Sequence, residues 1–121
     1  MHRLTILVVD DEYDNRLLMT HFLKRTTAKL LTAESVYGAK KVLHDTHIDL
    51  VVCDYLMTDG NGLDVLTYMH SEHLDLPFII CSSLERSEIP MQNKFDFKYV
   101  RKTDMRALLS EVQTCLSEIL H

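Results

Sequence analysis

The chain alternates short apolar runs with longer stretches in which apolar residues recur every three or four positions. The runs are rich in β-branched side chains, which is typical of strands buried on both faces. They predict strands over about 5–10, 28–33, 49–54, 78–82 and 97–101. The stretches between them predict amphipathic helices over about 13–26, 35–45, 62–72, 84–93 and 104–120. This alternation indicates an α/β fold with a parallel sheet covered by helices.

The connection lengths favour a doubly wound, five-stranded parallel sheet of strand order 2-1-3-4-5 with five helices. Right-handed crossovers then place the switch point of the sheet between the first and third strands. A chain of 121 residues is too short for a second module of similar size, so we expect residues 1–121 to form one domain.

The expected helices differ in quality. The last has a continuous apolar stripe that runs from Met105 to Leu120. The fourth contains Pro90 among polar residues and is expected to be short or irregular. In the first helix, Arg16 is expected to face solvent. The residues of that helix expected to face the sheet are Leu17, Leu18, Phe22 and Leu23.

Composition and charge exclude several classes of protein. A formal net charge of -5 argues against direct nucleic-acid binding, which requires a basic face. The sequence has no apolar stretch long enough for a signal peptide or a membrane span, so we expect a soluble cytoplasmic protein. Cys53, Cys81 and Cys115 are widely spaced among apolar neighbours and predict buried free thiols.

Four of the apolar runs end on polar side chains that a phosphoryl-transfer site needs. Asp10 and Asp11 follow the first run, and Asp54 follows the third. Ser82 ends the fourth run and Lys102 the fifth. Because the carboxyl ends of parallel strands meet at one edge of the sheet, these side chains are expected to converge there.

Neighbouring carboxylates repel one another unless they share a cation. Asp10, Asp11 and Asp54 offer only oxygen donors, which favours magnesium. The alternative is that Asp10 or Asp11 caps the first helix. Capping needs one side chain, whereas four acidic residues cluster between positions 10 and 14.

At a strand end, Asp54 can attack a phosphorus centre and hold the phosphoryl group as an acyl phosphate. Lys102 would neutralise the phosphoryl oxygens, and Ser82 could donate a hydrogen bond to them. Capping of a turn explains Ser82 equally well. An isolated lysine is usually a solvated surface residue, so Lys102 alone carries little weight. The hypothesis of a phosphoryl-transfer site rests on the joint placement of Asp54, Ser82 and Lys102.

These motifs together give the chain a resemblance, over its whole length, to the CheY-like receiver domains of response regulators in two-component signalling. The resemblance is carried by Val8-Val9-Asp10-Asp11-Glu12, Val51-Val52-Cys53-Asp54 followed by Met57 and Gly62, Pro77 before Ser82-Ser83, and Tyr99-Val100-Arg101-Lys102.

The resemblance implies that Asp54 is the phosphoacceptor and that a histidine kinase or phosphotransfer protein is the donor. It implies a magnesium cofactor ligated directly by Asp11, through water by Asp10, and by the backbone carbonyl of Leu56. Such a protein is a signalling switch rather than an enzyme, since it catalyses only its own phosphorylation and dephosphorylation.

The resemblance further implies that Ser82 is the switch hydroxyl and that Tyr99 changes rotamer with it. An aromatic residue that covers apolar surface on an edge strand is an equally good interpretation of Tyr99. Output to an attached domain or a partner protein is expected through the face of the fourth helix, fifth strand and fifth helix. Leu56 and Leu84 would tune the access of water to the acyl phosphate.

Two departures from the family pattern affect this interpretation. Thr103 follows Lys102 where the family usually has a proline, often after a cis bond. A cis bond before threonine would cost about 3–4 kcal/mol, so the bond is either enforced or trans with a shifted loop. The segment between Ser82 and Lys102 is also shorter than usual, which predicts a reduced fourth helix and an atypical partner surface.

Three other functions compete with a phosphorylated switch. One is a receiver-like interaction module that works without phosphorylation. A phosphatase resembling the haloacid dehalogenases would need a second aspartate two residues after Asp54, where the chain has Leu56. A flavodoxin-like cofactor site would need a phosphate loop after the first strand, where the acidic residues 10–12 would repel phosphate.

Overall fold

The computed structural model describes residues 3–90 and 96–120. Its main strands are β1 (Thr5–Val9), β2 (Lys29–Ala33), β3 (Leu50–Cys53), β6 (Phe78–Ser82) and β7 (Lys98–Arg101). Its helices are α1 (Tyr13–Leu23), α2 (Val36–Asp45), α3 (Gly62–Ser71) and α4 (Met105–Leu120), with a single 3-10 turn, η1 (Arg86–Glu88). The short strands β4 (Leu56–Met57) and β5 (Gly60–Asn61) form a hairpin between β3 and α3.

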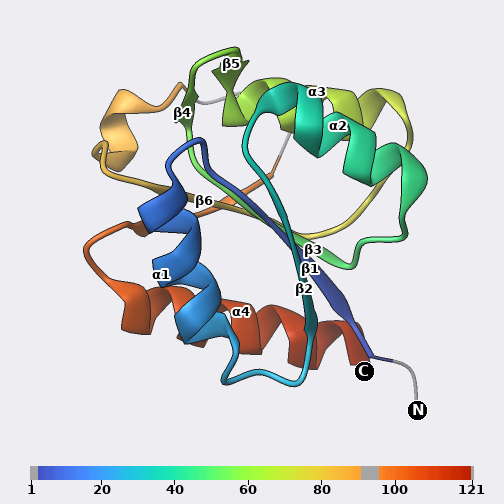
Figure 1. Ribbon diagram of the computed structural model, residues 1–121, viewed down its shortest axis with the longest axis vertical. Helices are drawn as coiled ribbons and strands as arrows, with labels where there is room; N and C mark the ends of the chain where they lie inside the picture. Colours follow the sequence, from blue (N-terminus) through green and yellow to red (C-terminus); the bar gives the residue numbers. More distant parts are fainter. Residues whose placement is uncertain (1–2, 91–95, 121) are drawn as a thin grey trace.

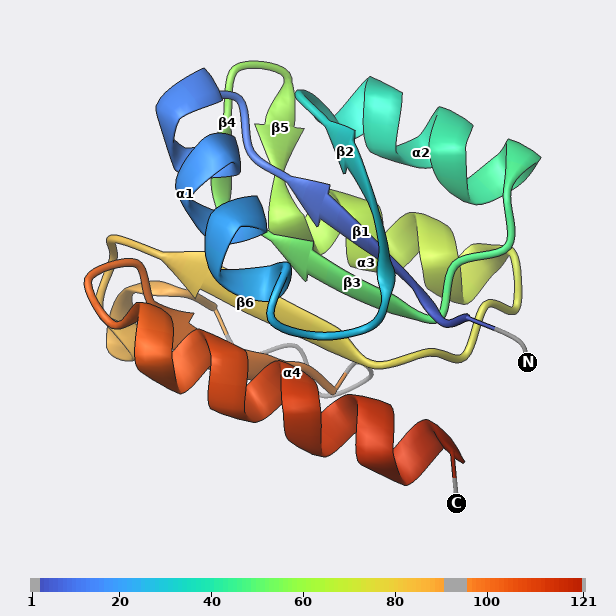
Figure 2. The same cartoon turned by 60° about the horizontal axis from the view of Figure 1, so that its bottom comes forward.

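The five main strands form one parallel sheet in the order β2-β1-β3-β6-β7. This order confirms the predicted 2-1-3-4-5 arrangement. Figure 1 shows the sheet nearly edge-on, with α2 and α3 on one side and α1 and α4 on the other. Figure 2 turns the face with α1 and α4 toward the viewer.

The core lies in two layers because successive side chains of a strand point to opposite faces of the sheet. Leu7 and Val9 of β1 pack with α2 and α3, whereas Ile6 and Val8 pack with α1 and α4. All four side chains are fully buried. The strands are therefore covered on both faces, which explains why their sequences are unbroken apolar runs.

The fourth helix was predicted over 84–93, and the prediction of five helices was wrong for the described residues. The described part of that segment contains only η1, and residues 91–93 lie outside the described residues. Pro90 cannot donate a backbone hydrogen bond, and few apolar side chains are available to hold a helix on the sheet. The expectation of a short or irregular element at this place is confirmed.

The orientation predicted for the first helix was wrong for Leu17 and Leu18, which are 53% and 45% exposed. The buried face of α1 is instead centred on Met19 and Leu23. These residues are four positions apart and therefore lie one above the other on the helix. Arg16 was expected to face solvent, but its side chain is only 15% exposed.

Cys53, Cys81 and Cys115 are buried free thiols, as predicted. Burial raises the pKa of the Cys81 thiol to about 12, so this thiol stays protonated and unreactive at neutral pH. None of the helices in residues 3–90 and 96–120 has both the length and the hydropathy needed to cross a bilayer.

Candidate functional site

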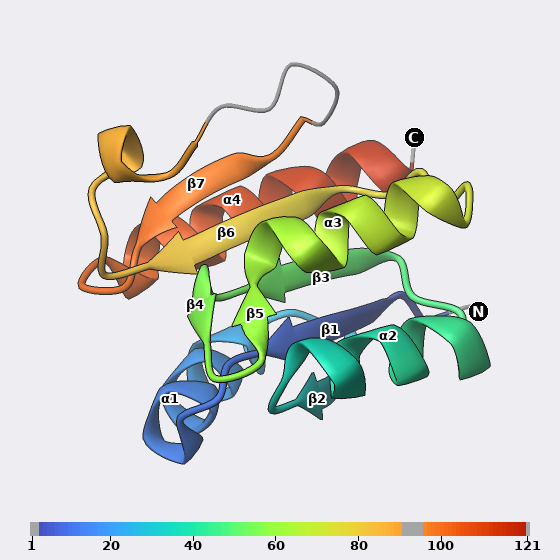
Figure 3. The ribbon, with the colours of Figure 1, turned by 90° about the horizontal axis from the view of Figure 1, so that it is seen from above.

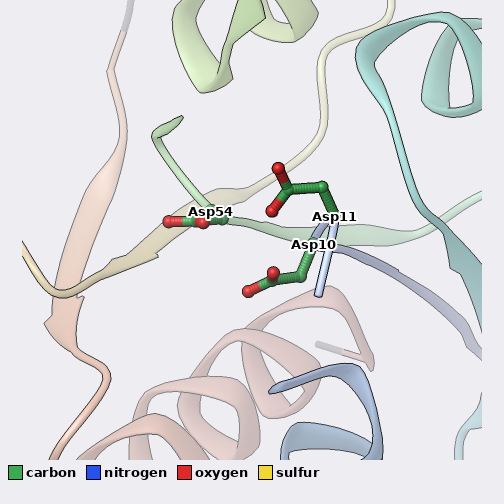
Figure 4. A group of neighbouring side chains, drawn as sticks. All are labelled: Asp10, Asp11 and Asp54. Carbon is green, nitrogen blue, oxygen red and sulfur yellow. The ribbon is translucent and has the colours of Figure 1, made fainter. Parts of the chain in front are cut away.

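Asp10, Asp11 and Asp54 meet beyond the carboxyl ends of β1 and β3. One carboxylate oxygen from each lies within 4.8 Å of those of the other two, and Figure 4 shows the three side chains together. The register of the sheet explains this proximity, because Val9 pairs with Cys53 and the Asp54 amide donates to the Val9 carbonyl across 2.9 Å. The convergence expected from the strand ends is therefore present.

The ammonium of Lys102 lies between two of these carboxylates. Its Nζ is 2.8 Å from Asp10 Oδ2 and donates a hydrogen bond to Asp54 Oδ2 across 2.9 Å. The backbone places it there, because the Lys102 amide donates to the Ser82 carbonyl and continues the pairing of β6 and β7. No cis peptide bond occurs in residues 3–90 and 96–120, so the Lys102–Thr103 bond is trans.

Burial and charge act in opposite directions on this ion pair. Desolvation raises the pKa of Asp54, and the nearby Lys102 ammonium offsets only part of the rise. Desolvation alone would lower the pKa of Lys102. The Asp10 and Asp54 carboxylates outweigh it and raise the pKa of the ammonium, which stays protonated at neutral pH.

The carboxylates keep oxygen lone pairs for a further ligand. Asp10 Oδ1 accepts from the Glu12 amide at 2.9 Å, and Asp54 Oδ1 accepts from the Tyr55 amide at 2.7 Å. Asp10 Oδ2 is buried and meets Lys102 outside hydrogen-bond geometry, so it makes no hydrogen bond within the described part of the chain. The Lys102 ammonium is the charged partner of this oxygen in the structure, and a hard divalent cation beside it would also be favoured by the three neighbouring carboxylates.

A cavity of about 290 Å³ lies at this edge of the sheet, and Asp10, which is fully buried, is not among its lining residues. Asp11, Asp54 and Lys102 line it, together with Leu56 and Ser83. Since all the nearby donors are oxygens and the cavity is open to solvent, the residues present fit a magnesium ion that retains some of its water.

Ser82 is buried, and its hydroxyl accepts a hydrogen bond from the Leu84 amide at 3.2 Å. The contact expected from turn capping is therefore present, while a contact with a phosphoryl group stays a prediction. The neighbouring Ser83 lines the cavity and was not identified from the sequence. The only available signal was that two hydroxyl residues follow the fourth apolar run.

Tyr99 is half-buried against the core layer under α2 and α3, and its hydroxyl donates to the backbone carbonyl of Leu84. Desolvation raises the pKa of Tyr99, which keeps this phenol a donor at neutral pH. Leu84 packs against the same layer. Of the two leucines expected to control water, Leu56 lines the cavity and is 54% exposed.

Arg16 is a second residue that the sequence interpretation missed. Its guanidinium donates to the backbone carbonyl of Asp10 at 2.7 Å and lies 3.6 Å from Glu34 Oε2. The side chain therefore supports the turn that carries Asp10 and Asp11. Only the position of Arg16 in the first helix hinted at this contact.

The comparisons with known proteins agree on one family. The model of the response regulator receiver domain family matches residues 6–111. The response regulator protein PilR of Pseudomonas aeruginosa is 30% identical over 120 residues, which are 96% of this chain and 27% of PilR. The DNA-binding transcriptional regulator NtrC of Azospirillum brasilense is 28% identical over 97% of this chain and 25% of its own length. The chain thus spans about a quarter of the length of these relatives.

Solved structures share the fold. The response regulator protein TrrA of Thermotoga maritima, in complex with Mg²⁺-BeF, has a TM-score of 0.81 and 27% identity over 93% of this chain and 98% of its own. The signal receiver domain of an HD domain-containing protein from Pseudomonas fluorescens has a TM-score of 0.84 over 97% of each chain, at 19% identity. Because the family model covers most of the sequence, the chain belongs to the response regulator receiver domains.

Proposed function

We propose that this chain is the phosphoacceptor of a two-component phosphorelay and that Asp54 takes a phosphoryl group from a histidine kinase or phosphotransfer protein. One observation carries the proposal. The Asp54 carboxylate lies in an open cavity, beside the carboxylates of Asp10 and Asp11 and 2.9 Å from the Lys102 ammonium. This is an arrangement suited to in-line attack on a phosphorus centre.

In the proposed reaction, a carboxylate oxygen of Asp54 forms a bond to phosphorus while the bond between phosphorus and the donor imidazole nitrogen breaks. The electron pair of the broken bond returns to the imidazole, which takes up a proton. Lys102 moves its hydrogen bond from the free Asp54 carboxylate to the phosphoryl oxygens. Ser82 or Ser83 supplies a further hydroxyl donor to them.

Asp10, Asp11 and Asp54, with the backbone carbonyl of Leu56, would hold the magnesium ion. When bound, magnesium neutralises the charge of the phosphoryl oxygens and of the crowded carboxylates. The three carboxylates, which each place an oxygen within 4.8 Å of the others, support this assignment. The Mg²⁺-BeF complex of TrrA supports it from a relative with the same fold.

The consequence of phosphorylation would be a change of partner surface rather than turnover of a substrate. We assign output to the surface formed by β7, α4 and the segment containing η1. We place this function in the cytoplasm. We expect no direct contact between this chain and nucleic acid. That segment is tied to β7 by the Arg101–Glu85 ion pair and by the Tyr99 hydrogen bond to Leu84. Movement of Ser82 toward a phosphoryl group would act on both contacts, because Ser82 and Leu84 share a turn.

Intact-mass analysis after incubation with acetyl phosphate and magnesium tests the proposal. The wild-type chain should gain the mass of one phosphoryl group, and Asp54→Asn should not. Omission of magnesium should abolish the adduct. An unmodified wild-type chain that also fails to bind magnesium would contradict the proposal and favour an interaction module that works without phosphorylation.

A further inference from the structure

Asp59, at the turn of the β4–β5 hairpin, holds the first amides of α2. Its Oδ1 accepts from the Val36 amide at 2.9 Å, and its Oδ2 accepts from the Tyr37 amide at 3.0 Å. These amides belong to the first turn of the helix and have no carbonyl partner within it. Figure 3 shows the hairpin turn beside the start of α2.

Asp59 is not needed for the ordinary capping of α2, because the helix already has its own cap. Ser35 occupies the N-cap position, and its hydroxyl accepts from the Gly38 amide at 2.9 Å. The two hydrogen bonds to Asp59 are additional to this cap, and Asp59 lies 23 residues after Val36 and 22 residues after Tyr37 in the chain. The contact therefore joins two parts of the fold rather than completing one helix.

Directly after the hairpin, Gly62 at the start of α3 packs tightly against the backbone of Asp54. The Gly62 amide donates to the Tyr55 carbonyl at 2.8 Å, and a Cβ atom added at Gly62 would lie 2.8 Å from the Asp54 carbonyl oxygen. At Gly60, an added Cβ would lie 3.2 Å from Val36 Cγ2. The hairpin thus has little room to move between Asp54 and α2.

The same hairpin forms one wall of the cavity at the carboxylates. Leu56 and Met57 of β4, together with Thr58 of the turn, line that cavity with Asp11 and Asp54. A displacement of the hairpin would therefore change the position of the Leu56 backbone relative to the carboxylates.

We propose that Asp59 is a positioning residue for the magnesium site. By accepting hydrogen bonds from the Val36 and Tyr37 amides, it would fix the hairpin and with it the Leu56 carbonyl, which the proposed function assigns to the metal. The inference rests on the proposed function for the existence of the metal site, and it adds Asp59 as a residue that acts through Leu56. Because coupling between two sites is reciprocal, magnesium binding should in turn strengthen the hold on the first turn of α2.

The test is a calorimetric titration of the full chain with magnesium alone. It compares wild type, Asp59→Ala, Asp59→Glu and Ser35→Ala. Asp59→Glu keeps the negative charge but displaces the carboxylate, so it separates positioning from simple attraction of the cation. Ser35→Ala removes a cap of the same helix and leaves the hairpin untouched.

Both Asp59 variants should bind magnesium about 10-fold more weakly than wild type, the lower end of the usual effect of removing an outer partner of a metal ligand. Ser35→Ala should bind as wild type does. In the wild-type chain, magnesium should slow hydrogen exchange of the Val36 and Tyr37 amides by up to about 10-fold, by the same reciprocity. Magnesium should not slow their exchange in Asp59→Ala.

Normal magnesium affinity in both Asp59 variants would overturn the inference. So would an equal loss in Ser35→Ala, which would assign the effect to the stability of α2. Normal affinity in Asp59→Glu with weak binding in Asp59→Ala would also overturn it, because charge alone would then explain the result. A wild-type chain that binds no magnesium would overturn the proposed function itself and can be distinguished from these outcomes in the first titration.

Discussion

Lys102 Nζ donates a hydrogen bond to Asp54 Oδ2 across 2.9 Å, although 48 residues separate the two in the sequence. The contact places a cation where a phosphoryl group on Asp54 would carry its charge. In the unphosphorylated chain this hydrogen bond engages the Asp54 carboxylate itself. Lys102 must therefore exchange this carboxylate for the phosphoryl oxygens during the proposed reaction.

Lys102→Met should slow phosphorylation of Asp54 by acetyl phosphate about 100-fold, because loss of a donor to a developing negative charge usually costs 10²–10³ in rate. The measurement is the rate of appearance of the phosphorylated mass at saturating magnesium. Lys98→Met is the matched control, since Lys98 pairs with Glu111 away from the carboxylates. Equal rates in Lys102→Met and wild type would remove Lys102 from the proposed mechanism.

Leu56→Asn should shorten the lifetime of phosphorylated Asp54 several-fold, because Leu56 lines the cavity and an amide there can position water. Leu84→Glu should have the smaller effect, since Leu84 packs against the core layer. The lifetime is measured by intact mass after removal of acetyl phosphate. Fast hydrolysis that both substitutions leave unchanged would contradict a shielding role for the two leucines.

Asp59 should make the stability of the fold depend on pH in the acid range. The hydrogen bonds from the Tyr37 and Val36 amides lower the pKa of Asp59 below its ordinary value. Its contribution is therefore fully present above the ordinary pKa of aspartate, about 3.9, and is lost as the pH falls through the lowered value. Urea unfolding of wild type and Asp59→Asn should differ at neutral pH and converge in acid. A difference that does not depend on pH would contradict this assignment.

The corrected orientation of α1 predicts opposite outcomes for two neighbouring positions. Met19→Ala removes a side chain that is 1% exposed and should lower the free energy of unfolding by about 2–5 kcal/mol. Leu17→Ala alters a side chain that is 53% exposed and should change it by no more than about 0.5 kcal/mol. Chemical denaturation of both variants measures the two values, and a larger loss in Leu17→Ala would restore the original orientation.

Local patterns predicted those parts of the fold in which burial dominates. The apolar runs before Asp10, Asp54 and Ser82 are buried on both faces, so their composition indicated central strands, whereas the strand order came from the connection lengths. In α1, by contrast, the two exposed leucines, Leu17 and Leu18, equal in number the two buried residues, Met19 and Leu23. A pattern of this kind allows several orientations, and packing against the sheet selects one of them.

The amino-acid sequence by itself determined that three carboxylates and an ammonium gather at one edge of a parallel sheet, because the strand ends follow from hydrophobic periodicity and the strand order from the connection lengths. Only the tertiary structure decided that the Lys102 ammonium contacts Asp10 and Asp54 and that the Lys102–Thr103 bond is trans. It also decided that Ser83 rather than Ser82 lines the cavity and that Asp59 accepts hydrogen bonds from the first amides of α2. These contacts join loops that are distant in sequence, and their geometry depends on how the loops pack against one another, which no local pattern encodes.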